Sequence, residues 1–267
     1  IWGYPYNGGY PEVNFTLLNA QHIFTPEFLK QLSGITINGN YGDAVMNPET
    51  PDIVEYFRSC SSTVEISIST NGGARDQAFW SKLANLRTKV FFCIDGLEDT
   101  HSLYRQNTVY STVLKNADIF IRADGYAVWK MIKFDHNRHQ QQACEDMAKQ
   151  MGFWRFENIW DGRDRGPVYT RDGEFSHWIG NLGPSESAGP PPLQALLDNH
   201  VTWYDRGTVK LEGDVADPEI RCVHKMNREL YVAADGTVYP CCYLGFYPRT
   251  MHHPGNDRVR EIGRAHV

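Results

Sequence analysis

The sequence predicts an α/β fold built on a parallel sheet or barrel, followed by a small cysteine-containing hairpin module. Short apolar or alternating runs begin near residues 35, 64, 89, 127 and 154, and stretches with helical spacing lie between them. Runs that recur at these intervals are typical of βα units, whose right-handed crossovers make neighbouring strands parallel. Turn-forming residues follow most of the runs, which supports the same division.

Five strands and five helices follow from this pattern. The strands are expected at residues 34–38, 64–69, 89–94, 127–134 and 153–159, and the helices at residues 25–32, 47–57, 75–86, 110–121 and 140–151. The helix over residues 75–86 illustrates the reasoning, because Phe79, Leu83 and Leu86 recur at helical spacing and would face the sheet together.

The pattern changes after residue 166. Residues 183–192 are rich in Gly, Pro and Ser, as in a linker. Two short runs on either side of Asp235-Gly236 then predict a β-hairpin. The sequence therefore divides into a partial barrel over residues 1–166, an irregular linker region over residues 167–219 and a small module over residues 220–261.

Composition places the chain among ordinary soluble globular proteins. Of its 267 residues, 41% are hydrophobic and 22% are charged, with a formal net charge of -6. No block of Lys or Arg stands out, and no apolar run is long enough to span a bilayer, so neither a nucleic acid nor a membrane is expected as a partner. The six cysteines lack the dense spacing of a disulfide framework, which favours a reducing cytoplasm.

Both ends of the sequence look artificial. Residue 1 is Ile, and residues 262–267 read as a common sequencing adapter translated in one frame, although a natural polar tail would also explain them. Residues 262–267 are therefore left out of the fold prediction. The chain is expected to be an incomplete copy of its parent protein.

Polar loops follow four of the predicted strands, at residues 38–43, 69–73, 93–96 and 135–137. Asn-Gly and Asp-Gly are common turn formers, so each loop taken alone has a purely structural explanation. The carboxyl ends of parallel strands, however, meet at one edge of a sheet or barrel. Four such loops in succession therefore predict a ligand site at that edge.

These loops resemble the motifs of the radical S-adenosylmethionine superfamily, whose members share a partial (βα)6 barrel. Tyr41-Gly42-Asp43-Ala44 is similar to the glycine-rich acidic motif that holds the amino group of the cosubstrate, with Asp43 in place of Glu and Ala44 in place of Pro. Ser69-Thr70-Asn71-Gly72 resembles the third-strand motif. Residues 92–96 resemble the fourth-strand motif, with Cys93 where Ser is usual. The visible strands would then be the second to sixth of the barrel.

The resemblance also implies a set of residues that contact the cosubstrate. Arg105 lies in a segment similar to a motif whose Arg pairs with the cosubstrate's carboxylate, a role that suits the guanidinium fork. A surface Arg beside a carboxylate of the protein is the alternative. The residues expected to bind S-adenosylmethionine are Tyr41, Gly42, Asp43, Ser69, Thr70, Asn71, Asp95, Arg105 and Asn137.

The cysteines near the C-terminus carry a second signal. Thirteen residues separate Cys222 from Gly236, and four separate Gly236 from Cys241. This spacing resembles the opening of the SPASM or twitch module of the same superfamily, which implies that Cys222, Cys241 and Cys242 bind an auxiliary iron–sulfur cluster. A zinc site and inert thiols are the alternatives.

The defining loop of the superfamily, Cys-x3-Cys-x2-Cys, is absent from the sequence. In the family this loop holds a 4Fe-4S cluster, which when reduced cleaves S-adenosylmethionine to a 5′-deoxyadenosyl radical that abstracts hydrogen from the substrate. The loop either precedes Ile1 in the parent protein or has been lost in a degenerate relative. The chain as given is expected to be inactive, whereas the full-length parent would be a radical S-adenosylmethionine enzyme.

The resemblance implies further partners as well. A reductant such as flavodoxin or ferredoxin would supply electrons, and relatives with the extra module often modify peptides or proteins. Two other functions stay open. One is a cofactor-independent (βα)-barrel enzyme that uses Asp43, Asp95 or His136, and the other is a non-catalytic relative that binds a peptide.

The truncation hypothesis predicts that the parent gene encodes the three-cysteine loop within about 40 residues upstream of Ile1, as the resemblance implies. Sequencing the parent DNA in that direction is the measurement. An upstream reading frame without clustered cysteines would contradict the hypothesis.

Overall fold

The computed structural model describes residues 13–39, 42–160, 166–170, 174–180 and 223–239. In chain order its elements are α1 (Leu17–Ile23), α2 (Pro26–Leu29), β1 (Gly34–Asn38), η1 (Ala44–Met46), α3 (Thr50–Cys60), β2 (Glu65–Thr70), α4 (Gln77–Asn85), β3 (Lys89–Cys93), α5 (Glu98–Tyr104), α6 (Tyr110–Arg122) and β4 (Tyr126–Lys133). There follow η2 (Arg138–Gln140), α7 (Gln141–Met151), β5 (Arg155–Trp160), β6 (Gly166–Tyr169), β7 (Phe175–Ile179), α9 (Val223–Asn227), β8 (Tyr231–Val232) and β9 (Val238–Tyr239).

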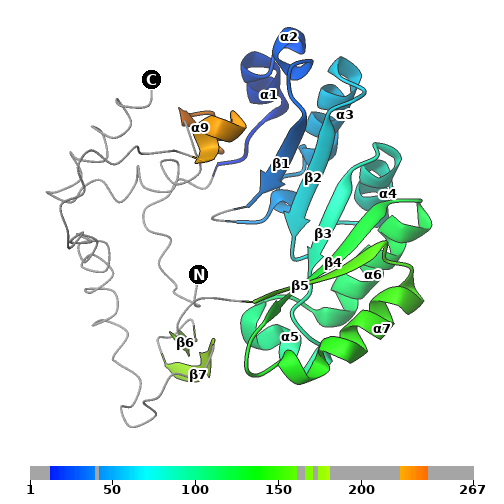
Figure 1. Ribbon diagram of the computed structural model, residues 1–267, viewed down its shortest axis with the longest axis vertical. Coiled ribbons are helices and arrows are strands. Elements are labelled where there is room, and N and C mark those ends of the chain that lie inside the picture. The colour runs from blue at the N-terminus through cyan, green and yellow to red at the C-terminus, as the bar shows by residue number, and fades with distance from the viewer. Residues whose placement is uncertain (1–12, 40–41, 161–165, 171–173, 181–222, 240–267) are drawn as a thin grey trace, which may run out of the picture. The chain divides into compact units, whose positions relative to one another are not determined.

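The first five strands form one parallel sheet in the order β1-β2-β3-β4-β5. Each strand lies beside the next one in sequence, so right-handed crossovers place the connecting helices on the same side. Figure 1 shows α3, α4, α6 and α7 along one side of the sheet. This is the arrangement of an arc of a βα barrel and not of a doubly wound sheet. The predicted α/β fold is confirmed.

The two faces of this sheet differ in chemistry because side chains alternate along each strand. The face toward the helices is apolar and buried, with Ile66 and Ile68 on β2, Val90 and Phe92 on β3 and Trp129 on β4. We call the opposite side the polar face. It carries Thr36, Ser67, Ser69, Phe91, Cys93, Lys130 and Glu157.

The core between sheet and helices is built on aromatic rings. Trp80 of α4, Phe92 of β3 and Phe120 of α6 are all fully buried, with ring centroids 5.2 to 6.3 Å apart. Phe153 touches both Phe92 and Trp129 from the α7–β5 loop. Tilted and edge-on contacts of this kind fix how α4 and α6 sit on the sheet.

Helix boundaries differ from the prediction where caps decide them. Asn47, where the predicted helix over residues 47–57 begins, does not cap α3. Its side chain accepts a hydrogen bond from the Glu49 amide in a preceding turn, and α3 begins at Thr50. Asp76 caps α4 by accepting from the Phe79 amide, so this helix starts at Gln77 and not at residue 75. At the other end of α7, Gly152 in the left-handed region (φ 86°) ends the helix where the sequence predicted.

Helices α1 and α5 were not predicted. In α5 only Thr100 and His101 are buried, and both are polar, so no apolar stripe marks the helix. In α1 the one buried residue is Ala20.

Two short hairpin-like pairs lie outside the sheet. β6 pairs with β7, and Val168 and Ile179 from these strands pack with Phe134 at the end of β4. β8 pairs with β9 in antiparallel register, with Gly236 at the turn (φ 85°). Cys222, Cys241 and Cys242, which flank this second pair in the sequence, lie outside the described residues.

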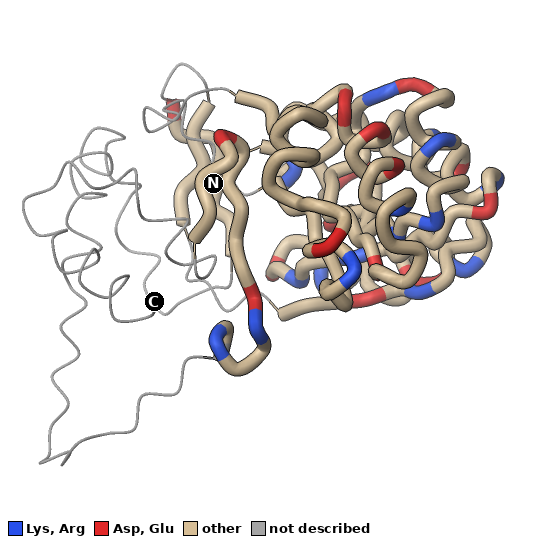
Figure 2. Tube along the Cα trace, turned by 90° about the horizontal axis from the view of Figure 1, so that it is seen from above, with Lys and Arg blue, Asp and Glu red and all other residues tan. Residues whose placement is uncertain are grey.

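Charged residues are interspersed along the described part of the chain. Figure 2 shows Lys and Arg segments alternating with Asp and Glu segments over the helical layer. None of the described helices combines the length and the apolar character that a bilayer crossing requires.

A glycine in the loop after β3 gives a test of this fold. Gly96 has φ 116°, and a Cβ there would lie 2.0 Å from Thr100 Oγ1. We expect Gly96→Ala to lower the free energy of unfolding by about 2–3 kcal/mol, because it adds backbone strain and a clash.

Gly42→Ala is the matched control, since a Cβ at Gly42 meets nothing within 4 Å. Its expected effect is within about 0.5 kcal/mol. Urea denaturation of both variants is the measurement. Equal loss in the two variants would show that the loop after β3 is not built as described.

Candidate functional site

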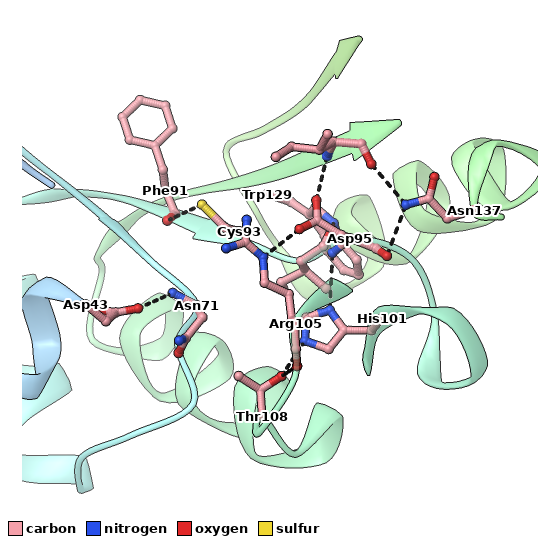
Figure 3. Close-up of polar contacts among 12 residues, drawn as sticks. Asp43, Asn71, Phe91, Cys93, Asp95, His101, Arg105, Thr108, Trp129 and Asn137 are labelled. Carbon is pink, nitrogen blue, oxygen red and sulfur yellow. Dashed lines mark hydrogen bonds and ion pairs between the residues drawn. The ribbon is translucent and has the colours of Figure 1, made fainter. Parts of the chain in front are cut away.

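The carboxyl edge of the sheet brings together the loops that the sequence singled out. The Asp43 carboxylate, in the loop after β1, accepts a hydrogen bond from the Asn71 amide after β2, at 2.6 Å. Its other oxygen accepts from the Val45 amide at 3.0 Å and so caps η1. Figure 3 shows Asp43 and Asn71 joined on one side of the site and Asp95 with Arg105 on the other.

Arg75 also connects the loop after β1 with the loop after β2. It lies in the left-handed region (φ 76°), which is uncommon for a residue with a side chain. Its guanidinium donates to the carbonyls of Val45, at 2.5 Å, and Met46. The segment that carries Asp43 is therefore fixed by contacts on both sides of η1.

Asp95 is the buried anchor of the site. It is fully buried, and its two carboxylate oxygens accept from Arg105 Nε at 2.6 Å and from the Ile132 amide at 2.5 Å. One residue thus links β3, the end of α5 and β4. Burial of an ion pair requires that both partners be well bonded, and this pair meets that requirement.

Asn137 completes the same junction. It is fully buried, and its Nδ2 donates to the carbonyls of Asp95 and Ile132, at 3.1 and 2.9 Å. Its Oδ1 accepts from the Phe134 amide at 2.8 Å. Its side chain is committed to three backbone groups, so Asn137 acts as a brace between β3 and β4.

His101, which the sequence analysis missed, supports this junction from α5. Its Nδ1 accepts from the Asp95 amide at 3.2 Å. Its Nε2 lies 3.1 Å from Thr108 Oγ1, whose own hydrogen is donated to the Arg105 carbonyl at 2.6 Å. Nε2 must therefore carry the proton, and the ring is neutral. Burial, with a smaller effect of Arg105, lowers the pKa of His101 to about 4.

Arg105 presents the rest of its guanidinium toward the polar face. Its Nε is bonded to Asp95, and its side chain is 23% exposed. The guanidinium carbon lies 4.8 Å from the centre of the Tyr104 ring. No described residue accepts a hydrogen bond from either Nη group. Arg105 thus pairs with a carboxylate of the protein through Nε, and its Nη groups stay available as donors to a second anion.

Cys93 lies between these groups at the end of β3 (Figure 3). Its thiol is partly buried and donates a long hydrogen bond to the Phe91 carbonyl, with Sγ 3.9 Å from the oxygen. Burial raises the pKa of the Cys93 thiol, while the neighbouring Arg105 and Lys130 act in the opposite direction. The thiol is therefore protonated at neutral pH.

The remaining predicted site residues divide between the two faces of β2. Ser69 is on the polar face, opposite Asn38 and Phe91. Thr70 is buried on the helix side, and its Oγ1 accepts from the Gly72 amide at 3.0 Å. Asn71 accepts from the Gly73 amide at 2.9 Å. Gly42 is exposed, and Tyr41 lies outside the described residues.

Metal-binding groups are not assembled in the described part of the chain. No three His, Cys, Asp or Glu side chains there lie in a position to hold an ion. The three described cysteines, Cys60, Cys93 and Cys144, are far apart in sequence and are all free thiols.

Comparisons with known proteins give a match in structure only. No protein-family model matches the chain, and no curated protein matches its sequence. SuiB of Streptococcus suis is similar at 10% identity and a TM-score of 0.52, over 85% of this chain and 54% of SuiB. A structure of SuiB bound to S-adenosylmethionine gives 12% identity and a TM-score of 0.52, over 85% and 53% of the two chains.

A structure of native anSMEcpe with bound AdoMet gives 17% identity and a TM-score of 0.48, over 84% of this chain and 64% of that one. The chain thus spans about half the length of SuiB. The likeness to SuiB shows that this chain has the same fold over most of its length.

The neutral state of His101 predicts a pH dependence of stability. The pKa of His101 is lowered from 6.5 to about 4 in the folded chain, so the unfolded chain binds more protons between these values. The stabilising contribution is present above about pH 6.5 and is lost as the pH falls toward 4, by about 3 kcal/mol at most.

His101→Gln should therefore flatten the fall in the free energy of unfolding over this range, measured by urea denaturation at a series of pH values. His139→Gln, at an exposed histidine, is the control and should leave the fall unchanged. Parallel curves for wild type and His101→Gln would contradict the buried neutral ring.

Proposed function

We propose that this chain forms the S-adenosylmethionine-binding part of a radical S-adenosylmethionine enzyme. Two lines of support are independent of each other. Its fold is that of SuiB, which has been solved bound to S-adenosylmethionine. Its strand-end loops resemble the binding motifs of the superfamily, and the residues of these loops meet at one edge of the sheet.

The observation that carries the proposal is that this edge presents a carboxylate, on Asp43, and a guanidinium, on Arg105. The methionine portion of S-adenosylmethionine has an ammonium and a carboxylate on one carbon. Asp43 offers a carboxylate to the former and the Nη groups of Arg105 offer donors to the latter. Asp43 is bonded to Asn71 after β2 and Arg105 to Asp95 after β3, so both lie at the same edge of the sheet.

The other expected contacts have different roles. Ser69 lies on the polar face and is proposed to contact the cosubstrate directly. Asn71, Asp95 and Asn137 hold the loops in place through backbone hydrogen bonds. Gly42 and Tyr41 are proposed contacts on sequence grounds.

A catalytic iron–sulfur cluster does not fit the residues of this sequence. The Cys-x3-Cys-x2-Cys loop is absent from it, and the described residues offer no alternative set of ligands. We therefore assign to this chain the binding and orientation of S-adenosylmethionine, and no step of its cleavage.

Two finer parts of the proposal rest on the sequence. Cys222, Cys241 and Cys242 are proposed to bind an auxiliary iron–sulfur cluster, and what supports this is their spacing about Gly236, which lies at the turn between β8 and β9. A peptide or protein is the proposed substrate, as in relatives with the same module.

A cofactor-independent barrel enzyme is the weaker alternative. Such an enzyme needs an accessible acid–base pair at the strand ends. Of the three candidates, Asp95 is fully buried and ion-paired, and burial lowers the pKa of His136 to about 4. Asp95 is thus committed to the fold, and His136 is a weak base at neutral pH.

The proposal predicts that the chain binds S-adenosylmethionine and that Asp43→Asn weakens binding about tenfold, which corresponds to the loss of one charged hydrogen bond. Asn can accept from only one of the two backbone amides that bond Asp43, so the measured loss includes that of one hydrogen bond within the loop. Equilibrium dialysis with radiolabelled ligand is the measurement, and Asp118→Asn on the outer surface of α6 is the matched control.

The role of Arg105 is best tested by changing the ligand, because removing Arg105 would take its counter-charge from the buried Asp95 carboxylate. Decarboxylated S-adenosylmethionine should bind the wild-type chain more weakly than the parent compound. Absence of S-adenosylmethionine binding would rule out the proposed site. So would equal affinities of the wild type for S-adenosylmethionine and its decarboxylated form, together with equal affinities of the wild type and Asp43→Asn for S-adenosylmethionine.

A further inference from the structure

One cation on the polar face takes no part in the site described so far. Lys130 lies in the middle of β4, directly opposite Cys93 of β3 and Glu157 of β5 in the register of the sheet. It is partly buried, and its Nζ lies 5.5 Å from the centre of the Phe91 ring. The side chain thus extends toward β3 and holds its ammonium over the Phe91 ring.

The expected partner of Lys130 is bound elsewhere. Glu157 is its neighbour across the strands, yet Glu157 forms an ion pair with Arg155, two residues away on the same strand. Among the residues that the structure describes, no carboxylate lies within ion-pair distance of the Lys130 ammonium. A partly buried ammonium that pairs with no described carboxylate is available to an anionic ligand.

The other charges around Cys93 are each compensated by bonds within the chain. Four charged residues influence the thiol, namely Arg105, Asp95, Lys130 and Asp43. Asp95 is bonded to Arg105 and to a backbone amide, and Asp43 accepts from two backbone amides. Lys130 has only the Phe91 ring, which contributes a weak attraction.

We infer that Lys130, with the Phe91 ring beneath it, forms a carboxylate-binding subsite on the polar face beside Cys93. An ammonium over an aromatic ring suits a carboxylate attached to a short apolar stem, because the stem contacts the ring while the anion meets Nζ. The carboxylate belongs either to S-adenosylmethionine or to the substrate that reacts with it. This assignment of the ligand rests on the proposed function, whereas the anion preference itself does not.

The alkylation rate of the Cys93 thiol can be used to detect the anion preference of this subsite. Iodoacetate and iodoacetamide alkylate a thiolate in the same way, with a sulfur–carbon bond formed and iodide released, but only iodoacetate is an anion. We expect the rate ratio of iodoacetate to iodoacetamide at Cys93 to exceed that at Cys60 by roughly threefold at low ionic strength. Mass spectrometry of the two cysteine-containing peptides gives both rates in one sample.

The variants separate charge from shape. Lys130→Gln should lower the ratio at Cys93, and Lys130→Arg should retain it. Lys115→Gln, at an exposed position on α6, is the matched control and should leave the ratio unchanged. A ratio at Cys93 that is the same in wild type and Lys130→Gln would overturn the subsite.

A second measurement decides the question if the partly buried thiol reacts with neither reagent. Reductive ¹³C-methylation labels lysines and keeps their positive charge. On titration with sodium propionate, with sodium chloride as the reference, the Lys130 signal should shift and saturate while the Lys115 signal does not. Equal responses of the two signals would overturn the inference.

Adding S-adenosylmethionine distinguishes the source of the carboxylate. If S-adenosylmethionine protects Cys93 and propionate still shifts Lys130 in its presence, the subsite serves the substrate. If S-adenosylmethionine itself shifts Lys130 and blocks propionate, the subsite serves the cosubstrate. If S-adenosylmethionine neither shifts Lys130 nor protects Cys93 while the anion preference persists, the proposed function fails and the subsite stands.

Discussion

The buried ion pair between Asp95 and Arg105 is the interaction on which the rest of the site depends. The Asp95 carboxylate has no access to water, so it must be neutralised and hydrogen-bonded within the chain. Arg105 meets the first demand and the Ile132 amide the second. This requirement fixes the end of β3 against β4 and draws the end of α5 back toward the sheet. The positions of Cys93 and of the Arg105 guanidinium follow from it.

The sheet was predictable from the sequence because each strand and helix buries a recognisable apolar pattern. The near-continuous apolar run of β3 and the stripe of α6 are examples, and their boundaries agree with the structure to within about two residues. Helix α5 escaped prediction for the opposite reason. It buries two polar residues, Thr100 and His101, which bond to Gln140 and to Asp95 and Thr108, so the helix has no apolar periodicity.

The site was predictable in its location but not in its internal bonding. Polar loops after successive parallel strands had to meet at one edge, and Asp43, Asn71 and Asp95 do lie there. The pairing of Asp95 with Arg105 requires the chain to reverse through α5, and the burial of Asn137 requires three backbone partners to converge. Neither the ion pair nor the buried Asn137 produces a recognisable pattern in the local sequence. Cosubstrate contacts expected of Thr70 and Asn137 stay predictions, and both side chains are buried and bonded within the chain.

The double attachment of the η1 segment has a consequence for ligand affinity. Asp43 is held by the amide of Asn71, and Arg75 clamps the carbonyls of Val45 and Met46. This segment therefore loses its conformational entropy when the chain folds and not when a ligand binds. Association then costs little ordering of the protein at this point, so contacts made with Asp43 contribute nearly in full to affinity. A preorganised carboxylate of this kind also selects its ligand by geometry. A ligand whose cation lies away from Asp43 binds more weakly, because the segment that carries Asp43 is already held in place.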